Sequence, residues 1–308
     1  MNRPFFSPAP GFGPRSRRRL PGSLKPALVA VVGISRVIAR QPLVLAGLIV
    51  LVSLLFVAAG ANWIAPQSPY TQALGARLLP PSAHHWFGTD QLGRDVFSRV
   101  VHGSRYTLLI ALLAGALIAP FGLLTGLCAG YFGGIVDRSI MRITDIFMAF
   151  PRLLLALALA AAMGPGIGNA ILAIAISAWP PYARQARAEA LALRQRDFVL
   201  ASQMAGASHL RIVCYHLLPL CTASALVRLT IDLAGIILVT AGLGFLGLGV
   251  QPPMPEWGTM VASGRQFLWP YWWVSTIPGM AIFVASFAFN LIGDGLREML
   301  DPKRGTQP

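Results

Sequence analysis

Five long stretches of this 308-residue chain carry no charged side chain. They cover residues 41–76, 106–136, 153–183, 233–255 and 266–293, and a helix that crosses a lipid bilayer needs roughly 20 apolar residues. Because 55% of the residues are hydrophobic and only 12% are charged, too few polar side chains remain to enclose five buried helices in a soluble shell. The sequence therefore predicts an all-α integral membrane protein.

We expect about six transmembrane helices, one more than the number of uncharged stretches. The third helix is predicted to begin near Ile140 and to include Arg142, Asp145 and Arg152, because residues 153–163 alone are too short to cross the bilayer. The six predicted spans are Leu43–Ile64, Thr107–Ala129, Ile140–Met163, residues 169–183, Leu220–Gly247 and Trp273–Ile292.

The distribution of arginines predicts how the chain is oriented. The net charge of +14 does not indicate a nucleic-acid partner, since no basic stripe alternates with stacking aromatic residues. Arg36 and Arg40 precede the first span, and a second arginine-rich segment lies at residues 184–219; the positive-inside rule places both in the cytoplasm. The predicted division is a cytosolic tail at 1–42, a first helix at 43–64, an extracytoplasmic loop at 65–103, a five-helix core at 104–296 that includes the cytosolic loop 184–219, and a cytosolic tail at 297–308.

The chain lacks the sequence signatures of an enzyme. A phosphate-binding loop needs a lysine directly after a glycine, but the two lysines, Lys25 and Lys303, follow other residues. The His-Glu-x-x-His pattern of zinc proteases is also missing. We therefore expect a non-catalytic chain without a cofactor, so that any energy from ATP must come from separate subunits.

Two groups of potential metal ligands are interpreted as ordinary side chains. His84 and His85 are adjacent and have no cysteine or carboxylate at ligand spacing, which is more typical of solvated loop residues than of a metal site. Cys128, Cys214 and Cys221 lie in or beside apolar or cytosolic segments, where packing is a more common role than disulfide formation. No metal is expected.

Arg228 and Asp232 form a possible charged pair inside a predicted span. They lie one helical turn apart, and a charge at the centre of a span costs on the order of 2.5–3.5 kcal/mol. Either the two side chains pair within the bundle, or Arg228 lies near the inner interface; a structural ion pair is favoured over a substrate contact. This pair is also the feature that would suit the alternative hypothesis of a stand-alone secondary transporter or channel.

The cytosolic loop is predicted to contain a short helix from Asp197 to Gly206. Asp197 suits the N-cap position, and Gly206 suits the position after the helix, where glycine adopts a left-handed backbone at little cost. One face of this helix is apolar, so that either a partner protein covers it or it packs on the chain's own helix ends. The stripe consists of Phe198, Ala201 and Ala205, with Met204 beside them.

The same loop resembles the cytosolic signature of bacterial ATP-binding-cassette importer permeases. The family pattern is Glu-Ala-Ala, three residues, Gly, nine residues, Ile, one residue and Leu-Pro. This chain has matching residues at Ala201, Gly206, Leu218 and Pro219, and differs at Leu200, in place of the Glu, and at Ser202, in place of the second Ala. The resemblance implies an ATPase-coupling loop that includes Phe198, Ala201, Ser202, Met204, Gly206, Leu218 and Pro219.

Three further segments are similar to the C-type permease subunits for dipeptides, oligopeptides and nickel. They are Phe-Gly-Thr-Asp-Gln-Leu-Gly-Arg-Asp at 87–95, Gly-Phe-Leu-Gly-Leu-Gly at 244–249 with Pro-Glu-Trp-Gly at 255–258, and Asn-Leu-Ile-Gly-Asp-Gly-Leu-Arg at 290–297 with Asp-Pro at 301–302. The resemblance extends from about residue 85 to residue 302.

The resemblance implies a permease subunit in the inner membrane of a bacterium. Its expected partners are a second homologous permease, two cytosolic ATPase subunits, an extracytoplasmic substrate-binding protein and membrane lipid. ATP is expected to bind to the ATPase partners, and the substrate, most often a di- or oligopeptide and in some relatives nickel, to cross by alternating access.

Overall fold

The structure is a computed structural model that describes the backbone of residues 42–300. These residues are helical, with no strand among them apart from one isolated bridge between Thr89 and Asp95. Most of each predicted cytosolic tail, 1–42 and 297–308, lies outside the described residues. The helices are α2 (Pro42–Ala59), α3 (Ala61–Ile64), α4 (Val96–Phe132), α5 (Gly134–Met148), α6 (Arg152–Met163), α7 (Ile167–Ala178), α8 (Pro180–Leu193), α9 (Asp197–Met204), α10 (His209–Arg211), α11 (Leu218–Phe245), α12 (Trp257–Gly264) and α13 (Trp273–Leu300).

Four helical segments in this part of the chain are long and apolar enough to cross a membrane. They are Pro42–Ala59, Val96–Phe132, His209–Phe245 and Trp273–Glu298, and α5 with α6 makes a fifth if this bent pair is one span. The prediction of helical membrane spans is confirmed, but the count of about six is higher than this number. The predicted span at 169–183 is divided between the 12-residue α7 and α8, which begins at Pro180.

The predicted third span is wrong as a single straight helix. Between α5 and α6 the chain bends by 91°. Pro151 is the residue before α6, and because a proline has no backbone N–H and disfavours helical geometry in the preceding residue, it ends α5 nearby. Arg152 therefore begins a new helix instead of lying within a long one.

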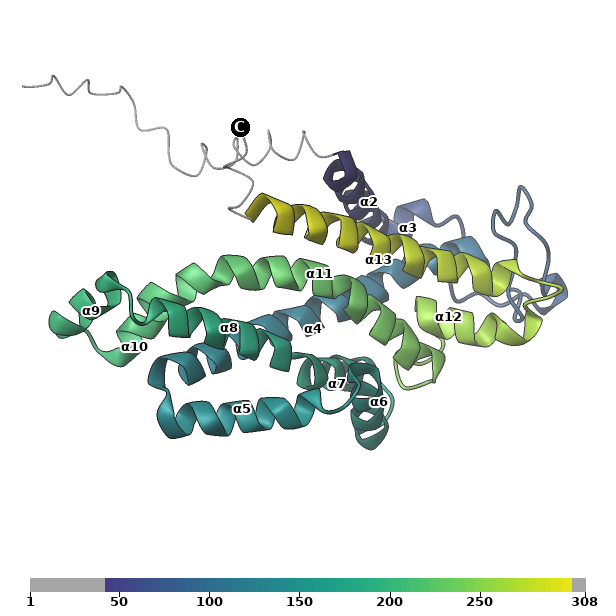
Figure 1. Ribbon diagram of the computed structural model, residues 1–308. Coiled ribbons are helices and arrows are strands. Elements are labelled where there is room, and N and C mark those ends of the chain that lie inside the picture. The colour runs from purple at the N-terminus through teal and green to yellow at the C-terminus, as the bar shows by residue number, and fades with distance from the viewer. Residues whose placement is uncertain (1–41, 301–308) are drawn as a thin grey trace, which may run out of the picture. The chain divides into compact units, whose positions relative to one another are not determined.

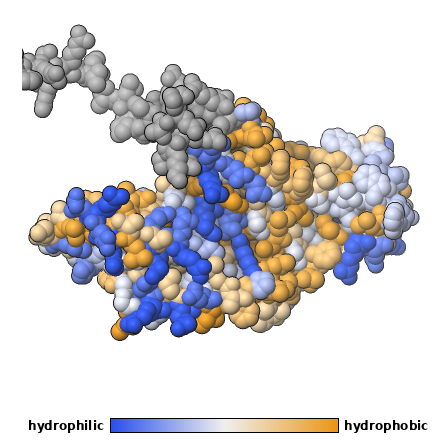
Figure 2. All heavy atoms as spheres, in the orientation of Figure 1, coloured by the Kyte–Doolittle hydropathy of each residue, from blue (hydrophilic) through white to orange (hydrophobic). Residues whose placement is uncertain are grey.

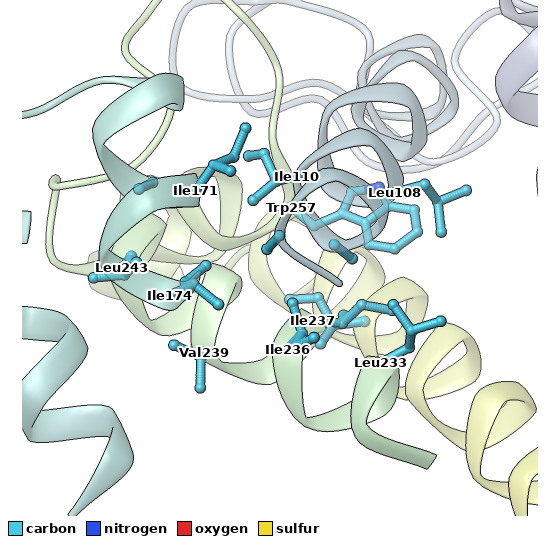
Figure 3. Packing of buried hydrophobic residues seen from close by; sticks show 14 of the residues in the cluster. Leu108, Ile110, Ile171, Ile174, Leu233, Ile236, Ile237, Val239, Leu243 and Trp257 are labelled. Carbon is cyan, nitrogen blue, oxygen red and sulfur yellow. The ribbon is translucent and has the colours of Figure 1, made fainter. Parts of the chain in front are cut away.

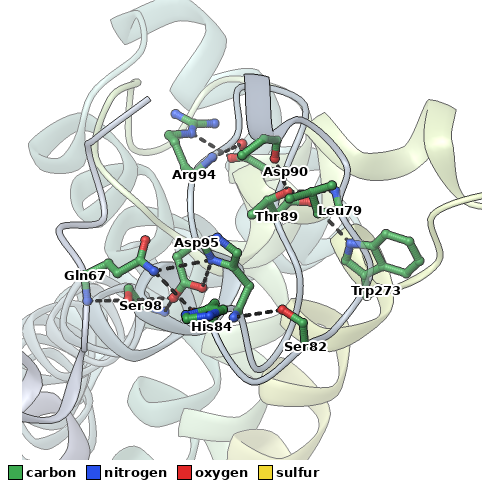
Figure 4. A network of polar contacts seen from close by, with 12 residues as sticks. Gln67, Leu79, Ser82, His84, Thr89, Asp90, Arg94, Asp95, Ser98 and Trp273 are labelled. Atoms are coloured by element: carbon green, nitrogen blue, oxygen red, sulfur yellow. Dashed lines mark hydrogen bonds and ion pairs between the residues drawn. The ribbon is translucent and has the colours of Figure 1, made fainter. Parts of the chain in front are cut away.

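The loop at 65–95 is folded, and α4 begins at Val96, inside the stretch 65–103 that was predicted to be extracytoplasmic. Asp95 caps α4 by accepting a hydrogen bond from the Ser98 backbone N–H at 2.8 Å. In the same loop Arg94 donates to Asp90 at 2.7 Å, and His85 Nδ1 lies 3.1 Å from Asp95 Oδ1, so this histidine serves the loop's hydrogen-bond network (Figure 4). Residues 96–103 are consequently the first two turns of α4.

The loop is also anchored to the other end of the chain. The indole N–H of Trp273, the first residue of α13, donates to the carbonyl of Thr89 at 3.2 Å. Nearby, Glu256 caps α12 by accepting from the N–H groups of Gly258 and Thr259, and burial raises the pKa of this carboxyl to about 7 despite those bonds, which act to lower it. The 65–95 loop and α12 both lie at this end of the bundle, and the two together are called the cap below (Figure 1).

Two hydrophobic clusters hold the helices together. The larger one, close to the cap, joins α4, α7, α11 and α12 and includes Leu108, Ile174, Ile237 and the fully buried Trp257 (Figure 3). The smaller one joins α4 and α8 to the α9–α11 segment, and Val199 of α9 lies within it. α9 and α10 thus sit at the end of the bundle opposite the cap (Figure 1).

Close backbone packing between α4 and α8 depends on three glycines of α4, spaced four residues apart. A Cβ added at Gly122 would lie 2.7 Å from the carbonyl oxygen of Trp179, one at Gly126 2.2 Å from that of Ala183, and one at Gly130 2.6 Å from that of Arg187. Small residues at such spacing allow two helices to approach closely in a membrane. The glycines therefore fix the position of α8, which leads into α9.

Hydrophobic side chains cover the middle of the bundle on the face seen in Figure 2, and hydrophilic ones gather toward the end that carries α9 and α10.

Two arginines of α8 pair with acidic residues of α5: Arg187 with Asp137, and Arg184 with Asp145 at 2.7 Å. These two ion pairs connect α5 to α8.

Candidate coupling surface and intramembrane charge cluster

The α9 helix begins at Asp197, the residue predicted to be its N-cap, and therefore one residue earlier than expected. Asp197 is its first helical residue, and Arg196, the residue before it, makes no side-chain cap. The prediction of Asp197 as the N-cap is therefore wrong. Its carboxylate still lies in the first turn, where a negative charge interacts favourably with the positive end of the helix dipole.

The end of α9 matches the prediction for Gly206. This glycine has a φ of +79°, and two backbone hydrogen bonds close the helix around it: Gly206 N–H to the carbonyl of Gln203 at 2.9 Å, and Ala207 N–H to that of Ser202 at 3.0 Å. This pair of bonds defines a Schellman motif, in which a left-handed residue satisfies the last carbonyls of a helix. Gly206 thus sets the direction in which the chain leaves α9.

The apolar stripe of α9 is exposed. Phe198 is 41% exposed and Met204 91% exposed, and Ala201 and Ala205 are exposed beside them. The alternative in which this stripe packs on the chain's own helix ends is therefore wrong in this structure. Instead, the opposite side of α9 attaches the helix through Val199, which is fully buried.

A groove of about 570 Å³ lies where α9 faces the end of α4, and Leu200 and Gln203 are the α9 residues that line it. Tyr131, at the end of α4, bonds to His209 Nδ1 at 2.8 Å and accepts from Gln203 at 3.4 Å, which links α4, α9 and α10 across the groove. Leu200 is 46% exposed in this groove. The position where the family pattern has a glutamate therefore presents an apolar side chain.

The other residues of the predicted coupling loop have different surroundings. The Ser202 hydroxyl donates to the Phe198 carbonyl within α9 at 2.7 Å. Leu218 and Pro219 form the first turn of α11, where Leu218 packs on the smaller hydrophobic cluster. These last two residues start a spanning helix and are not part of α9.

Asp232 pairs with Arg152 instead of with Arg228. Its Oδ1 lies 2.6 Å from Nη1 of Arg152, and its Oδ2 accepts from the Tyr182 hydroxyl at 3.2 Å. The cluster joins α6, α8 and α11, and Asp232 is part-buried, with 22% of its side chain exposed. The helical spacing that suggested an Arg228–Asp232 pair is overridden by a partner from another helix.

Arg228 interacts with neutral groups. Its guanidinium carbon lies 5.3 Å from the centre of the Tyr182 ring, and its Nη1 donates to the Gln185 side-chain oxygen at 3.3 Å. A cation over an aromatic face is a favourable arrangement. Tyr182 and Gln185 carry no signal in the sequence, whereas Arg152 was visible as a charge within an apolar stretch.

Comparison with known proteins gives two family matches. The family described as binding-protein-dependent transport system inner membrane component matches residues 120–306, and the N-terminal transmembrane domain of oligopeptide transport permease C matches residues 34–81. A solved structure of the MetNI methionine ABC transporter is similar to 66% of this chain and 96% of its own, with a TM-score of 0.52 and 22% identity, which indicates a shared fold.

Several curated relatives match almost the whole chain. It is 45% identical over 265 residues to the probable D,D-dipeptide transport system permease protein DdpC of Escherichia coli, covering 86% of this chain and 89% of the relative. It is 46% identical over 265 residues to the di/tripeptide permease DppC of Pseudomonas aeruginosa, covering 84% and 88%. The nickel permease NikC of Escherichia coli is 43% identical over 260 residues, covering 84% and 94%.

Proposed function

This chain belongs to the family of binding-protein-dependent transport system inner membrane components, and on that premise we propose that it moves di- or oligopeptides into the cell. It is a permease subunit of an ABC importer. The observation that carries the peptide assignment is the 46% identity to a di/tripeptide permease along 84% of this chain. Nickel is the second candidate cargo, supported by the 43% identity to a nickel permease.

The complete importer is proposed to contain a second, homologous permease, two cytosolic ATPase subunits and an extracytoplasmic binding protein. The exposed stripe of α9 supports the ATPase part of this proposal, because an apolar helix face such as Phe198 and Met204 fits a groove on a partner protein. The folded cap made by the 65–95 loop and α12 offers a surface at the opposite end for a binding protein.

Transport is proposed to proceed by alternating access. Movement of an ATPase would shift α9, which is attached through Val199 to the cluster that includes α4 and α8. The α4 glycines allow the backbones of α4 and α8 to pack in close contact. A shift of α9 would therefore move α4 and α8 together and not only the cytosolic loop. A stand-alone transporter is the weaker alternative, since its supporting feature, an Arg228–Asp232 pair, is replaced by the Arg152–Asp232 pair.

A reconstituted complex tests this function. We expect the purified chain to hydrolyse no ATP, and a complex of both permeases, the two ATPases and the binding protein in liposomes to take up a labelled dipeptide in an ATP-dependent way. Excess unlabelled dipeptide should compete with this uptake and nickel ions should not. Turnover by the chain alone, or uptake that needs no ATP, would contradict the proposal.

Thiol labelling tests the proposed orientation, in which α9 is cytosolic and the cap is extracytoplasmic. Cysteines at the exposed positions Ser82 and Gln266 should react with an impermeant reagent added outside intact spheroplasts, and one at Ser208 should react only after lysis. The background chain lacks Cys128, Cys214 and Cys221, and the reverse labelling pattern would mean an inverted orientation.

A further inference from the structure

The face of α11 that carries Arg228 contains an arginine that forms no direct ion pair with a carboxylate of residues 42–300. Arg152 and Arg228 lie around the Tyr182 side chain, and Asp232 pairs with Arg152. The Glu189 carboxylate reaches Arg228 only through Gln185, which donates to it at 3.1 Å. The Arg228 guanidinium is therefore held by the neutral side chains of Gln185 and Tyr182, and a charge without a direct counter-ion is costly within a membrane-spanning helix.

The two guanidinium groups also have donors that bond to nothing in the described chain. Nε and Nη2 of Arg152 and Nε of Arg228 are buried without a hydrogen-bond partner. Buried donors on charged groups are nearly always satisfied, and an unsatisfied one needs an explanation. A negatively charged acceptor would satisfy these unpaired donors.

A groove beside this cluster is large enough to admit such an acceptor. It has a volume of about 630 Å³ and includes Arg228 in its wall, which is within the usual range of about 300–1,000 Å³ for small-molecule sites. Its other polar lining residues are Gln185, Ser224 and Arg297, and Val227 and Ile231 add apolar surface.

A second groove lies further along α11, on the other side of the charge cluster. It has a volume of about 370 Å³ and is lined by apolar residues, among them Leu153, the neighbour of Arg152 in sequence. Ala241 and Gly242 place it on the half of α11 nearer the cap. A solute that follows α11 from the cap would therefore leave an apolar surface and meet the guanidinium groups.

We propose that Arg228 binds the carboxylate group of the solute as it passes along α11. Nη1 of Arg228 is already engaged by Gln185, which leaves the Nε edge for a carboxylate after rotation of the side chain toward the groove. A planar guanidinium pairs with a carboxylate through two parallel hydrogen bonds. Asp232 keeps Arg152 occupied, so that Arg228 is the arginine left for the solute. This inference rests on the proposed function, since every peptide with a free C-terminus carries a carboxylate.

The test compares uptake by the complete complex with Arg228→Gln, Arg228→Lys and, as a control, Arg138→Gln. Arg138 is an exposed arginine of α5 outside the cluster. Uptake of a labelled dipeptide, measured per ATP hydrolysed, should fall about tenfold in Arg228→Gln, because a charge-assisted bond is lost, and should recover in part in Arg228→Lys. The C-terminal amide of the same dipeptide, supplied at equal occupancy of the binding protein, should be taken up equally by wild type and Arg228→Gln.

Other outcomes would overturn the inference. Equal uptake of the free dipeptide by all variants would show that Arg228 does not contact the solute. A parallel loss of assembly and ATP hydrolysis would assign Arg228 a structural role, and an effect restricted to vesicles with anionic lipid would assign the site to a lipid headgroup. If wild type takes up no dipeptide at all, it is the proposed function that fails.

Discussion

Replacing Gly126 with leucine is expected to abolish folding of the subunit in the membrane. A Cβ at this position would lie 2.2 Å from the Ala183 carbonyl oxygen and 2.7 Å from the Ala186 Cβ. Overpacking a core costs roughly 1–3 kcal/mol where side chains can move, and here the obstructing atom is backbone of α8, so the helices must separate. The measurement is the amount of monodisperse subunit after mild detergent extraction, together with its co-purification with the second permease.

The matched control for this variant is Gly168→Leu. Gly168 is exposed in α7, and no atom lies within 4 Å of a Cβ built there, so this variant should be extracted in wild-type amounts. If Gly126→Leu is recovered like the control and still transports, α4 and α8 do not pack at the observed separation in the functional complex.

The second large effect is expected at α9, where Phe198→Asp and Gly206→Val should each stop transport while the subunit remains inserted. Phe198 is 41% exposed on the apolar stripe, so a charge there would be buried without a partner in an ATPase groove. Gly206 has a φ of +79° and free space around its Cβ position. Valine would therefore act through backbone strain, which costs on the order of 1–3 kcal/mol, and would displace the end of α9.

Membrane level, co-purification with the ATPases and dipeptide uptake are measured together for these variants. Tyr215→Asp serves as a control, since Tyr215 is an exposed aromatic residue of the same segment, 77% exposed and outside the stripe. Full uptake by both α9 variants would show that α9 does not couple ATP hydrolysis to transport. Loss of the protein itself would instead point to a role in folding.

In the segment around α9, the sequence predicted local features well where a single residue determines the backbone. Gly206 ends α9 as expected, because a left-handed residue after a helix is a local requirement that glycine meets at little cost. Asp197 was predicted as the N-cap but is the first residue of the helix, since a carboxylate suits both the cap and the first turn. The sequence did not identify Val199 as the buried anchor of α9. This helix has apolar residues on two sides, and the sequence does not say which side packs on the rest of the chain and which is exposed.

Hydropathy alone did not predict the number and shape of the spans, because it takes no account of where a proline bends the chain. Uncharged stretches located every long helix, but Arg142 and Asp145 were read as part of one span with residues 153–163, although Pro151 separates α5 from α6 by a 91° bend. The proline is visible in the sequence, but the angle between α5 and α6 depends on the helices that each of them packs against.

The sequence by itself determined that this chain is a helical membrane protein of the importer permease family, because hydrophobic length and a spaced signature are properties of the linear chain. Only the tertiary structure decided which arginine Asp232 binds, how closely α4 approaches α8, and which side of α9 is exposed. Each of these depends on residues far apart in sequence. Asp232 and Arg152 are 80 residues apart, and their pairing follows from the orientation of two helices, which no local pattern encodes.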